Sequence, residues 1–198
     1  MDKVFIIGRD EVPAQVRIEG SENLRWTFVA LPGCSADLNV EFILAGPGAA
    51  LDLAGLYLCL SDEKLNLNIT VRHSSGGCLS RQLFKGIAGG SARAYFDGLI
   101  YVARGSQKTK AYQESHSILL SETAVSEARP QLEIYADDVE CSHGATSGYL
   151  DADQLFYMRS RGIPEAEAKR LQIISFLAPV LERVPEELAD DIISECQA

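Results

Sequence analysis

Residues 130–163 read PQLEIYADDVECSHGATSGYLDADQLFYMRSRGI, and this stretch decides the fold. Apolar and polar residues alternate from Leu132 to Ala136, as they do in a β-strand with one buried face. An Asp137-Asp138 pair then predicts a turn. Beyond the turn the alternation resumes, and its period of two places three side chains on one face of a second strand: Val139, Cys141 and His143.

The same stretch continues from strand into helix. Gly144 and Gly148 bracket a polar segment, after which Asp151 is a suitable N-cap for a helix over residues 152–161 that Gly162 can end. We therefore predict a β-domain over residues 1–148 and a C-terminal helical region over residues 149–198. The predicted buried side of this first helix consists of Leu155, Phe156 and Met158.

Two further helices are predicted in the C-terminal region. Pro164 suits the first turn of the second helix, and Pro179 should kink or end it. Spacings of three and four give this helix an apolar stripe of Ala168, Leu171, Ile174 and Leu177. Pro185 should start a third short helix that runs through residues 192–193.

Cys141 and His143 are the strongest candidates for a chemical role. A cysteine thiolate and a histidine imidazole are both suitable ligands for iron. Two ligands do not complete a site, so a metal-binding interpretation requires further ligands from another position or another chain. The alternative is structural: Cys141 fills an inward position and His143 makes one hydrogen bond. The spacing alone favours this structural alternative.

The remaining thiols and imidazoles carry weaker signals. Four cysteines show no CxxC spacing and are predicted to be small buried or incidental residues: Cys34, Cys59, Cys78 and Cys196. The other two histidines, His73 and His116, are predicted to be surface or core residues rather than ligands.

The composition limits the class of protein. With 198 residues, 46% of them hydrophobic, the chain can bury a substantial core. No apolar run reaches the roughly 18 residues that span a bilayer, and the N-terminal apolar stretch is too short for a secretory signal. Five widely spaced cysteines form no paired framework, so we expect a cytoplasmic protein with reduced thiols. The net charge of −10 argues against nucleic-acid binding.

Motifs for catalysis are missing from the sequence. It contains no GxxxxGK[ST], and its Gly-Gly pairs at 76–77 and 89–90 do not open a helix after a strand, so we expect no ATP hydrolysis by this chain. Asp137 and Asp138 are adjacent and would face opposite sides of a strand, which makes them a poor acid–base pair. We therefore predict no catalytic residue.

The first 148 residues contain short strands and no helix long enough to build βαβ units. Residues 38–44 match residues 65–71 at an offset of 27, and residues 55–58 match residues 98–102 at an offset of 43, close to two steps of about 21 to 22. Such repetition favours a β-solenoid of stacked coils. Because the periodicity is loose, a β-sandwich is the alternative. Residues 80–86 could form a short turn.

A solenoid would stack its inward residues as apolar ladders. The candidates for this core are Val40, Phe42, Leu67, Ile69, Val71, Ala94, Phe96, Ile100, Val102, Leu132 and Ile134. The ends of an open solenoid have unpaired strand edges, which invite another chain. We therefore expect a dimer through the last coils, near residues 130–143.

Several motifs occur in the order and spacing of a known family: SRQLFKG at 80–86, QKT at 107–109, PQLEI through CSHGAT at 130–146, and LFYMRSRGI at 155–163. The sequence resembles the SufD/SufB family of iron–sulfur cluster assembly proteins, and the SufD branch in particular, over roughly residues 65–180. The resemblance implies a right-handed parallel β-helix followed by a small helical region. Relative to full-length members, this chain lacks an N-terminal helical region and several coils, as a short homologue or a fragment would.

The resemblance also implies a function. The chain would be a non-catalytic scaffold of a SUF-type (SufBCD) complex, pairing with a SufB-like chain or with itself and docking a SufC-like ABC ATPase on its C-terminal helices. A transient iron–sulfur cluster would be shared with the partner chain, with His143 and Cys141 as tentative ligands on this side. The predicted partner-binding residues are Leu155, Phe156, Tyr157, Arg159 and Arg161. The alternatives are a carbohydrate-active β-helix enzyme and an interaction module without assembly activity.

Overall fold

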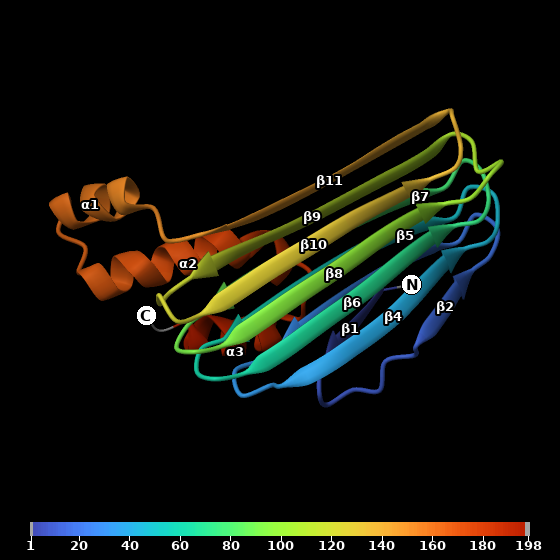
Figure 1. Cartoon of the computed structure of the whole chain (residues 1–198). Helices are drawn as coiled ribbons and strands as arrows, with labels where there is room; N and C mark the ends of the chain where they lie inside the picture. Colours follow the sequence, from blue (N-terminus) through green and yellow to red (C-terminus); the bar gives the residue numbers. More distant parts are fainter. Residues whose placement is uncertain (1, 197–198) are drawn as a thin grey trace.

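The computed structural model describes residues 2–196, and in this part of the chain eleven β-strands precede three α-helices (Figure 1). The strands are β1 (Asp2–Ile6), β2 (Gln15–Ile18), β3 (Asn23–Ala30), β4 (Ala36–Leu44), β5 (Ala50–Cys59), β6 (Lys64–His73), β7 (Leu79–Ala88), β8 (Arg93–Val102), β9 (Thr109–Leu119), β10 (Val125–Ile134) and β11 (Val139–Gly148). The helices are α1 (Ala152–Ser160), α2 (Glu165–Leu181) and α3 (Glu186–Glu195).

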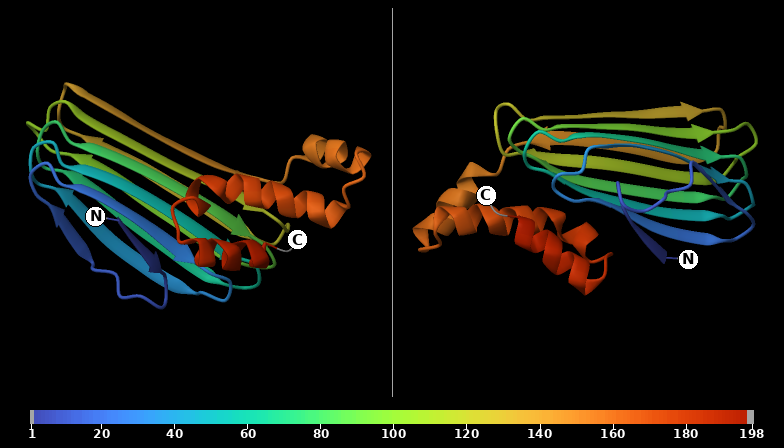
Figure 2. Two further views of the ribbon diagram at one scale, coloured as in Figure 1. Left: turned by 180° about the vertical axis from the view of Figure 1, so that it is seen from behind. Right: turned by 90° about the horizontal axis from the view of Figure 1, so that it is seen from below.

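Successive strands alternate between two sheets. The odd sheet has the order β1-β3-β5-β7-β9-β11 and the even sheet the order β10-β8-β6-β4-β2, and the strands that pair in each sheet are parallel. Each coil thus contributes one strand to each sheet, and the two sheets face one another across a common interior (Figure 2). The predicted parallel β-solenoid followed by helices is confirmed.

The repeat length differs from the predicted one. In the even sheet Leu38 pairs with Leu67, and Leu67 pairs with Phe96, so one coil takes 29 residues in this region (67 − 38 and 96 − 67). The predicted offset of 27 was wrong by two residues, and a slip of two keeps every side chain on the same face, so alternation alone could not detect it. Gly55 and Gly98 belong to different sheets, so the offset of 43 is not a repeat.

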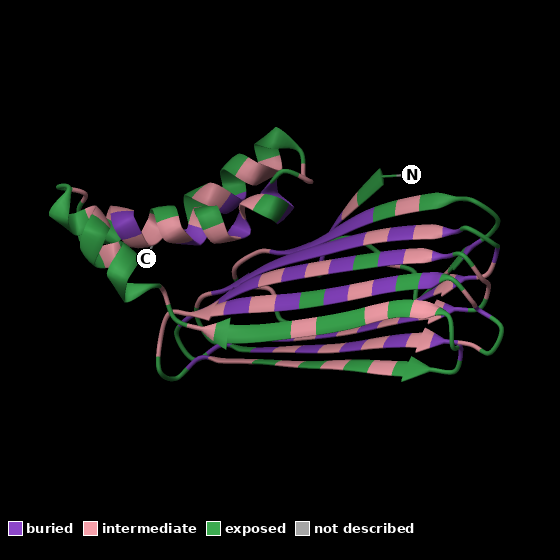
Figure 3. Ribbon diagram, turned by 90° about the horizontal axis from the view of Figure 1, so that it is seen from above, coloured by how far each residue is buried: buried purple, intermediate pink, exposed green. Residues whose placement is uncertain are grey.

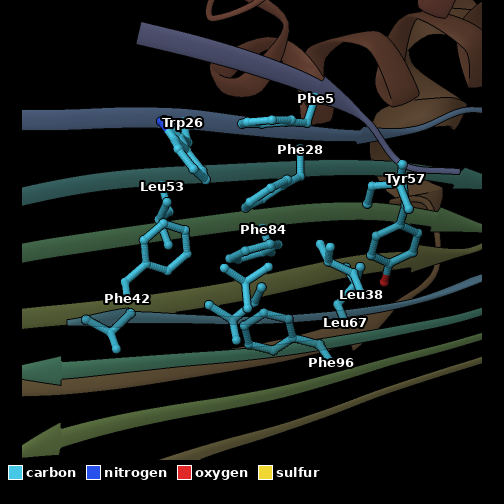
Figure 4. Close-up of a cluster of buried hydrophobic side chains, with 14 of the residues drawn as sticks. Phe5, Trp26, Phe28, Leu38, Phe42, Leu53, Tyr57, Leu67, Phe84 and Phe96 are labelled. Atoms are coloured by element: carbon cyan, nitrogen blue, oxygen red, sulfur yellow. The ribbon is translucent and has the colours of Figure 1, made fainter. Parts of the chain in front are cut away.

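Aromatic rings fill the interior of the first coils. The Phe5 and Trp26 ring centroids lie 4.7 Å apart, and the Phe84 and Phe96 centroids, from facing sheets, lie 4.5 Å apart (Figure 4). Nine of the predicted core residues are buried inside the solenoid: Val40, Phe42, Leu67, Ile69, Val71, Ala94, Phe96, Ile100 and Val102. The other two lie in the last coil, where Leu132 is half-buried and Ile134 is 40% exposed.

The segment predicted as a short turn at residues 80–86 is instead the middle of β7. The sequence misled because two polar side chains in it point into the interior and find partners there. Ser80 Oγ lies 2.9 Å from His73 Nε2, and Gln82 Oε1 accepts a hydrogen bond from Gln113. Gly86 fits the strand because the ring of Tyr57 occupies the space that a side chain would need.

A second core joins α2 and α3 to the outer face of the odd sheet. It consists of Val29, Ala54, Leu56, Leu58, Ile87, Ile173, Leu177, Val180, Leu181, Ile192 and Cys196. Arg183, between the two helices, adds a polar anchor to this core. Its guanidinium donates to Asp52 Oδ1 at 2.7 Å and to the Asp52 carbonyl at 2.9 Å.

The helices correct two predictions, the apolar stripe of α2 and the buried side of α1. α2 runs past Pro179 to Leu181, so of the two predicted effects of this proline the ending of the helix does not occur there. The buried face of α2 turns toward Ile173 and Val180 because these residues meet the odd sheet. Of its predicted stripe, Ala168 and Leu177 are buried and Ile174 is half-buried, whereas Leu171 is 38% exposed. α1 has no buried residue, since it packs against α2 rather than a sheet. Within residues 2–196 no helix is long and apolar enough to cross a membrane.

Candidate functional site

The described solenoid has an open end at β1 and β2 and another at the last coil, formed by β10 and β11. The last coil holds the candidate residues, and it is called the open end below. β10 is the terminal strand of the even sheet and β11 the terminal strand of the odd sheet, so one edge of each has no strand partner within residues 2–196. Alternate positions of β8 are buried, whereas neither β10 nor β11 contains a buried residue. Figure 3 shows this change from purple stripes to pink and green across the sheets.

Cys141 points into the interior at this open end. In the register of β11 with β9 it lies beside Ala111, and it packs against a small cluster that includes Ile100 and Val102. Burial raises the pKa of the Cys141 thiol above its ordinary value, and the carboxylate of Glu140 adds to this effect. Near neutral pH Cys141 is therefore a thiol, which would lose its proton on binding a metal ion.

His143 lies two residues further along β11 and shares the inward face with Cys141. Its register partner on β9 is Gln113, a buried residue whose own neighbour on β7 is Gln82. The His143 side chain is exposed, and in the described part of the chain its imidazole makes no hydrogen bond. The structure thus brings the two predicted candidates onto one face, with an imidazole free to bind a ligand.

The two side chains do not make a complete metal site within this chain. Among residues 2–196 no group of three His, Cys, Asp or Glu residues could hold a metal ion. Thiolate and imidazole are iron ligands, but a cluster needs about four. A cluster at the open end would therefore need further ligands from outside the described residues.

The other four cysteines lie away from β10 and β11, and all five thiols are free. Cys59 and Cys78 are buried, and burial raises the pKa of Cys59 to about 12. Cys196 packs in the core beneath the helices, where burial raises its pKa to about 11, and the pKa of the half-buried Cys34 is raised by the same cause. Three of these four cysteines are buried as predicted, Cys34 is half-buried, and their raised pKa values keep the thiols protonated near neutral pH.

The two remaining histidines occupy a core position and a position on the outer face of a sheet. His73 is fully buried at the end of β6, and burial lowers its pKa to about 4, so it is neutral near pH 7. His116 lies on the outer face of β9, where its Nδ1 is 2.7 Å from Thr146 Oγ1. Neither lies on the inward face of the last coil.

A second surface is formed by α1, and it holds the predicted partner-binding residues. Phe156 is 74% exposed and Tyr157 is 59% exposed, and the Arg161 guanidinium lies 5.3 Å from the Tyr157 ring. Arg159 is paired with Glu165 at 3.2 Å. Leu155 is half-buried and lines a smaller hollow between α1 and the odd sheet.

An open groove of about 650 Å³ separates α1 and α2 from the ends of β9 and β11. Its apolar lining includes Tyr149, Met158, Leu171 and Phe176. Large exposed aromatic residues beside an apolar groove are typical of an interaction surface. The sequence analysis did not predict the groove, which depends on how α2 lies against the sheet.

Two functional candidates escaped the sequence analysis. Gln82 and Gln113 stack inside the solenoid directly below His143, with Gln113 Nε2 donating to Gln82 Oε1 at 3.1 Å. The available signal was a glutamine at an inward position of each strand, where neighbouring coils carry apolar residues. The two glutamines can be recognised as neighbours only when the register of the strands is known.

Comparison with known proteins agrees with this architecture. A family model described as "SUF system FeS cluster assembly, SufBD core domain" matches residues 12–176. The chain is 40% identical over 149 residues to the iron–sulfur cluster assembly protein SufD of Escherichia coli (strain K12), and 38% identical over 181 residues to the protein ABCI7, chloroplastic, of Arabidopsis thaliana. It is 37% identical over 144 residues to the SufD of Bacillus subtilis (strain 168).

These alignments cover most of this chain but a minority of each relative. They include 75%, 83% and 73% of the chain, and 35%, 38% and 33% of the three relatives, respectively. The matched part is the solenoid together with the beginning of the helical region, since the family model ends within α2. The chain therefore belongs to the SufBD family of SUF-system iron–sulfur cluster assembly proteins.

Proposed function

We propose that this chain is a non-catalytic scaffold subunit in iron–sulfur cluster biogenesis. Its open last coil pairs with a SufB-like chain or with a second copy of itself, and its C-terminal helices dock a SufC-like ABC ATPase. A transient cluster is assembled between the paired chains, with His143 as a ligand on this side and Cys141 as a second one. The observation that carries this proposal is the open end, where an unpartnered imidazole and a thiol share one face.

The open end supports pairing with another chain for a physical reason. Both terminal strands offer unpaired backbone groups along one edge, and such an edge is a template for strand addition. At the same end Leu132 is half-buried and Ile134 is exposed. Pairing would therefore also remove apolar surface from water. A chain added there would lie directly over Cys141 and His143.

The α1 surface supports the docking of a second partner. It lies beyond the C-terminal end of β11, on the far side of residues 149–151 from Cys141 and His143, and its groove borders the last residues of that strand (Figure 1). ATP hydrolysis is assigned to the partner, because the sequence carries no phosphate-binding loop of its own. The free cysteines are consistent with the proposed cytoplasmic location.

Anaerobic affinity isolation of the tagged chain from its native cytosol tests this proposal. Mass spectrometry should identify an ABC-type ATPase and a SufB-like chain, or a dimer of this chain with the ATPase. Isolation of a clean, iron-free homodimer without an ATPase would contradict the scaffold function.

Two variants separate the two surfaces and serve as controls for each other. Phe156→Ser on α1 should lose the ATPase and keep the scaffold partner. Ala145→Lys, which places a charge in the open end, should lose the scaffold partner and keep the ATPase. Loss of both partners from both folded variants would contradict the separation of the two surfaces.

A further inference from the structure

The interior below His143 contains a polar ladder that the apolar core does not explain. Gln82, Gln113 and His143 occupy one register position on β7, β9 and β11, so their side chains point the same way from neighbouring coils. Gln113 is 1% exposed and Gln82 is 3% exposed. Side-chain amides are rarely buried without full hydrogen bonding, because a buried polar group without a partner loses its hydrogen bonds to water and gains none in return.

The hydrogen bonding of this ladder is incomplete at both of its ends, since Gln82 Nε2 and Gln113 Oε1 are buried without a partner, and the Gln113 end is the one that faces His143. Gln113 Nε2 donates to Gln82 Oε1, which fixes the direction of the Gln113 amide. Gln113 Oε1 is buried and has no hydrogen-bond partner. The next position of the ladder is His143, whose ring nitrogens are also without a partner. Neighbouring strands lie about 4.8 Å apart, a spacing that side chains at one register position can bridge with a hydrogen bond.

Gly98, on β8 of the facing sheet, leaves the space that the Gln113 amide occupies. A Cβ atom on residue 98 would lie 2.6 Å from Gln113 Oε1, so the amide occupies the space that a side chain at this position would need. The neighbouring inward residues of β8, Phe96 and Ile100, are large and apolar. The glycine therefore leaves room for the Gln113 amide where the ladder needs it.

We propose that Gln113 is a positioning residue for His143, with its Oε1 accepting a hydrogen bond from one ring nitrogen of the imidazole. An acceptor on one nitrogen fixes the tautomer and leaves the other nitrogen unprotonated, which is the form that binds a metal. Gln82 holds the Gln113 amide in the required direction. This inference rests on the ligand role proposed for His143, and it adds the group that orients the ring.

The tautomer of His143 is measurable without any cluster. In protein labelled with ¹⁵N-histidine, long-range ¹H–¹⁵N spectra at a pH where the ring is neutral report which nitrogen carries the proton. His143 is assigned from the signal that His143→Gln removes. We expect one dominant tautomer in the natural chain, by about tenfold for a hydrogen bond worth 1.4 kcal/mol. Averaged shifts of the two ring nitrogens in the folded natural chain would overturn the proposal.

Two variants test the cause, and a third is the matched control. Gln113→Met removes the acceptor, and Gly98→Ala should displace the amide while the chain still folds, since the group that must move is the end of a flexible side chain. In both variants the chemical shifts of the two His143 ring nitrogens should move toward their average. Gln131→Met on the outer face of β10 should leave them unchanged. Unchanged signals in Gly98→Ala and Gln113→Met would contradict the assignment, and either variant alone suffices if the other does not fold.

The same proteins distinguish this inference from the proposed function. Iron and sulfide bound to the anaerobic complex report the ligand role of His143, whereas the ¹⁵N spectra report its orientation. If His143→Ala leaves the iron content unchanged while Gln113→Met still averages the tautomers, the ligand role fails and the positioning stands. If His143→Ala loses iron while Gln113→Met leaves the tautomer unchanged, the ligand role of His143 stands and its positioning by Gln113 is overturned.

Discussion

The middle coils and the last coil of the solenoid have the same strand pattern but different surroundings. Ile100 and Val102 on β8 are fully buried, whereas their register partners on β10, Leu132 and Ile134, are half-buried and exposed. The direction of each side chain follows from alternation along its strand, but its burial depends on whether another coil lies above it. The last coil therefore keeps apolar surface and two potential iron ligands available to a partner.

The largest effect should come from comparing matched residues in these two regions. Ile100→Ala should lower the free energy of unfolding by about 2–5 kcal/mol, because it opens a cavity in a closed interior. Leu132→Ala, one coil further, should cost less than half as much, since Leu132 is already partly in contact with water. Denaturant unfolding of the isolated chain measures both. Equal losses would mean that the last coil is as closed as the middle ones.

The buried histidine of the middle coils should make stability depend on pH. Burial lowers the pKa of His73 to about 4, from an ordinary value of about 6.5. Between these values the unfolded chain binds a proton that the folded chain does not, so stability is present above pH 6.5 and is lost as the pH falls toward 4. The loss amounts to at most about 3 kcal/mol.

His73→Leu isolates this contribution. Its register neighbours, Leu44 and Val102, are aliphatic, so a leucine fits their ladder. The variant should lose less stability than the natural chain between pH 6.5 and 4, when unfolding is followed by circular dichroism. Identical pH profiles would show that His73 is not neutral in the folded state.

A smaller effect is expected where the helices join the sheet. Arg183→Met removes the ion pair and the hydrogen bonds to Asp52. It should lower the free energy of unfolding by about 1–2 kcal/mol. The loss is appreciable because the arginine side chain is only 9% exposed, and it is limited because the Asp52 side chain is 45% exposed to water. A double-mutant cycle with Asp52→Asn should give a coupling energy that accounts for part of this loss. Additive losses would contradict a direct interaction.

The sequence predicts the fold class well because alternation, turn residues and capping residues are local signals. It places Cys141 and His143 on one face, since the spacing of two needs only a strand. It misses the register, because Leu38 pairs with Leu67 rather than Leu65 and both choices keep the same face. It also misses the exposure of Phe156, because an apolar residue on a short helix is buried only if the fold brings a surface to it.

The polar ladder was beyond sequence reasoning for a related reason. Gln82 and Gln113 are 31 residues apart and meet only because one coil between β7 and β9 has that length. The same holds for the Gly98 position opposite them, which belongs to the other sheet. Long-range pairs of this kind depend on the length of each coil, and the coils of this chain are not all equally long.

The central claim is that the open last coil contributes His143 to a cluster shared with a partner. Its most direct test is the iron and acid-labile sulfide content of the anaerobically isolated complex, compared between the natural chain, His143→Ala and the control His116→Ala on the outer face of β9. We predict that His143→Ala keeps its partners, unfolds within about 0.5 kcal/mol of the natural chain and loses iron and sulfide, while His116→Ala retains both. Equal iron and sulfide in all three complexes would contradict the claim.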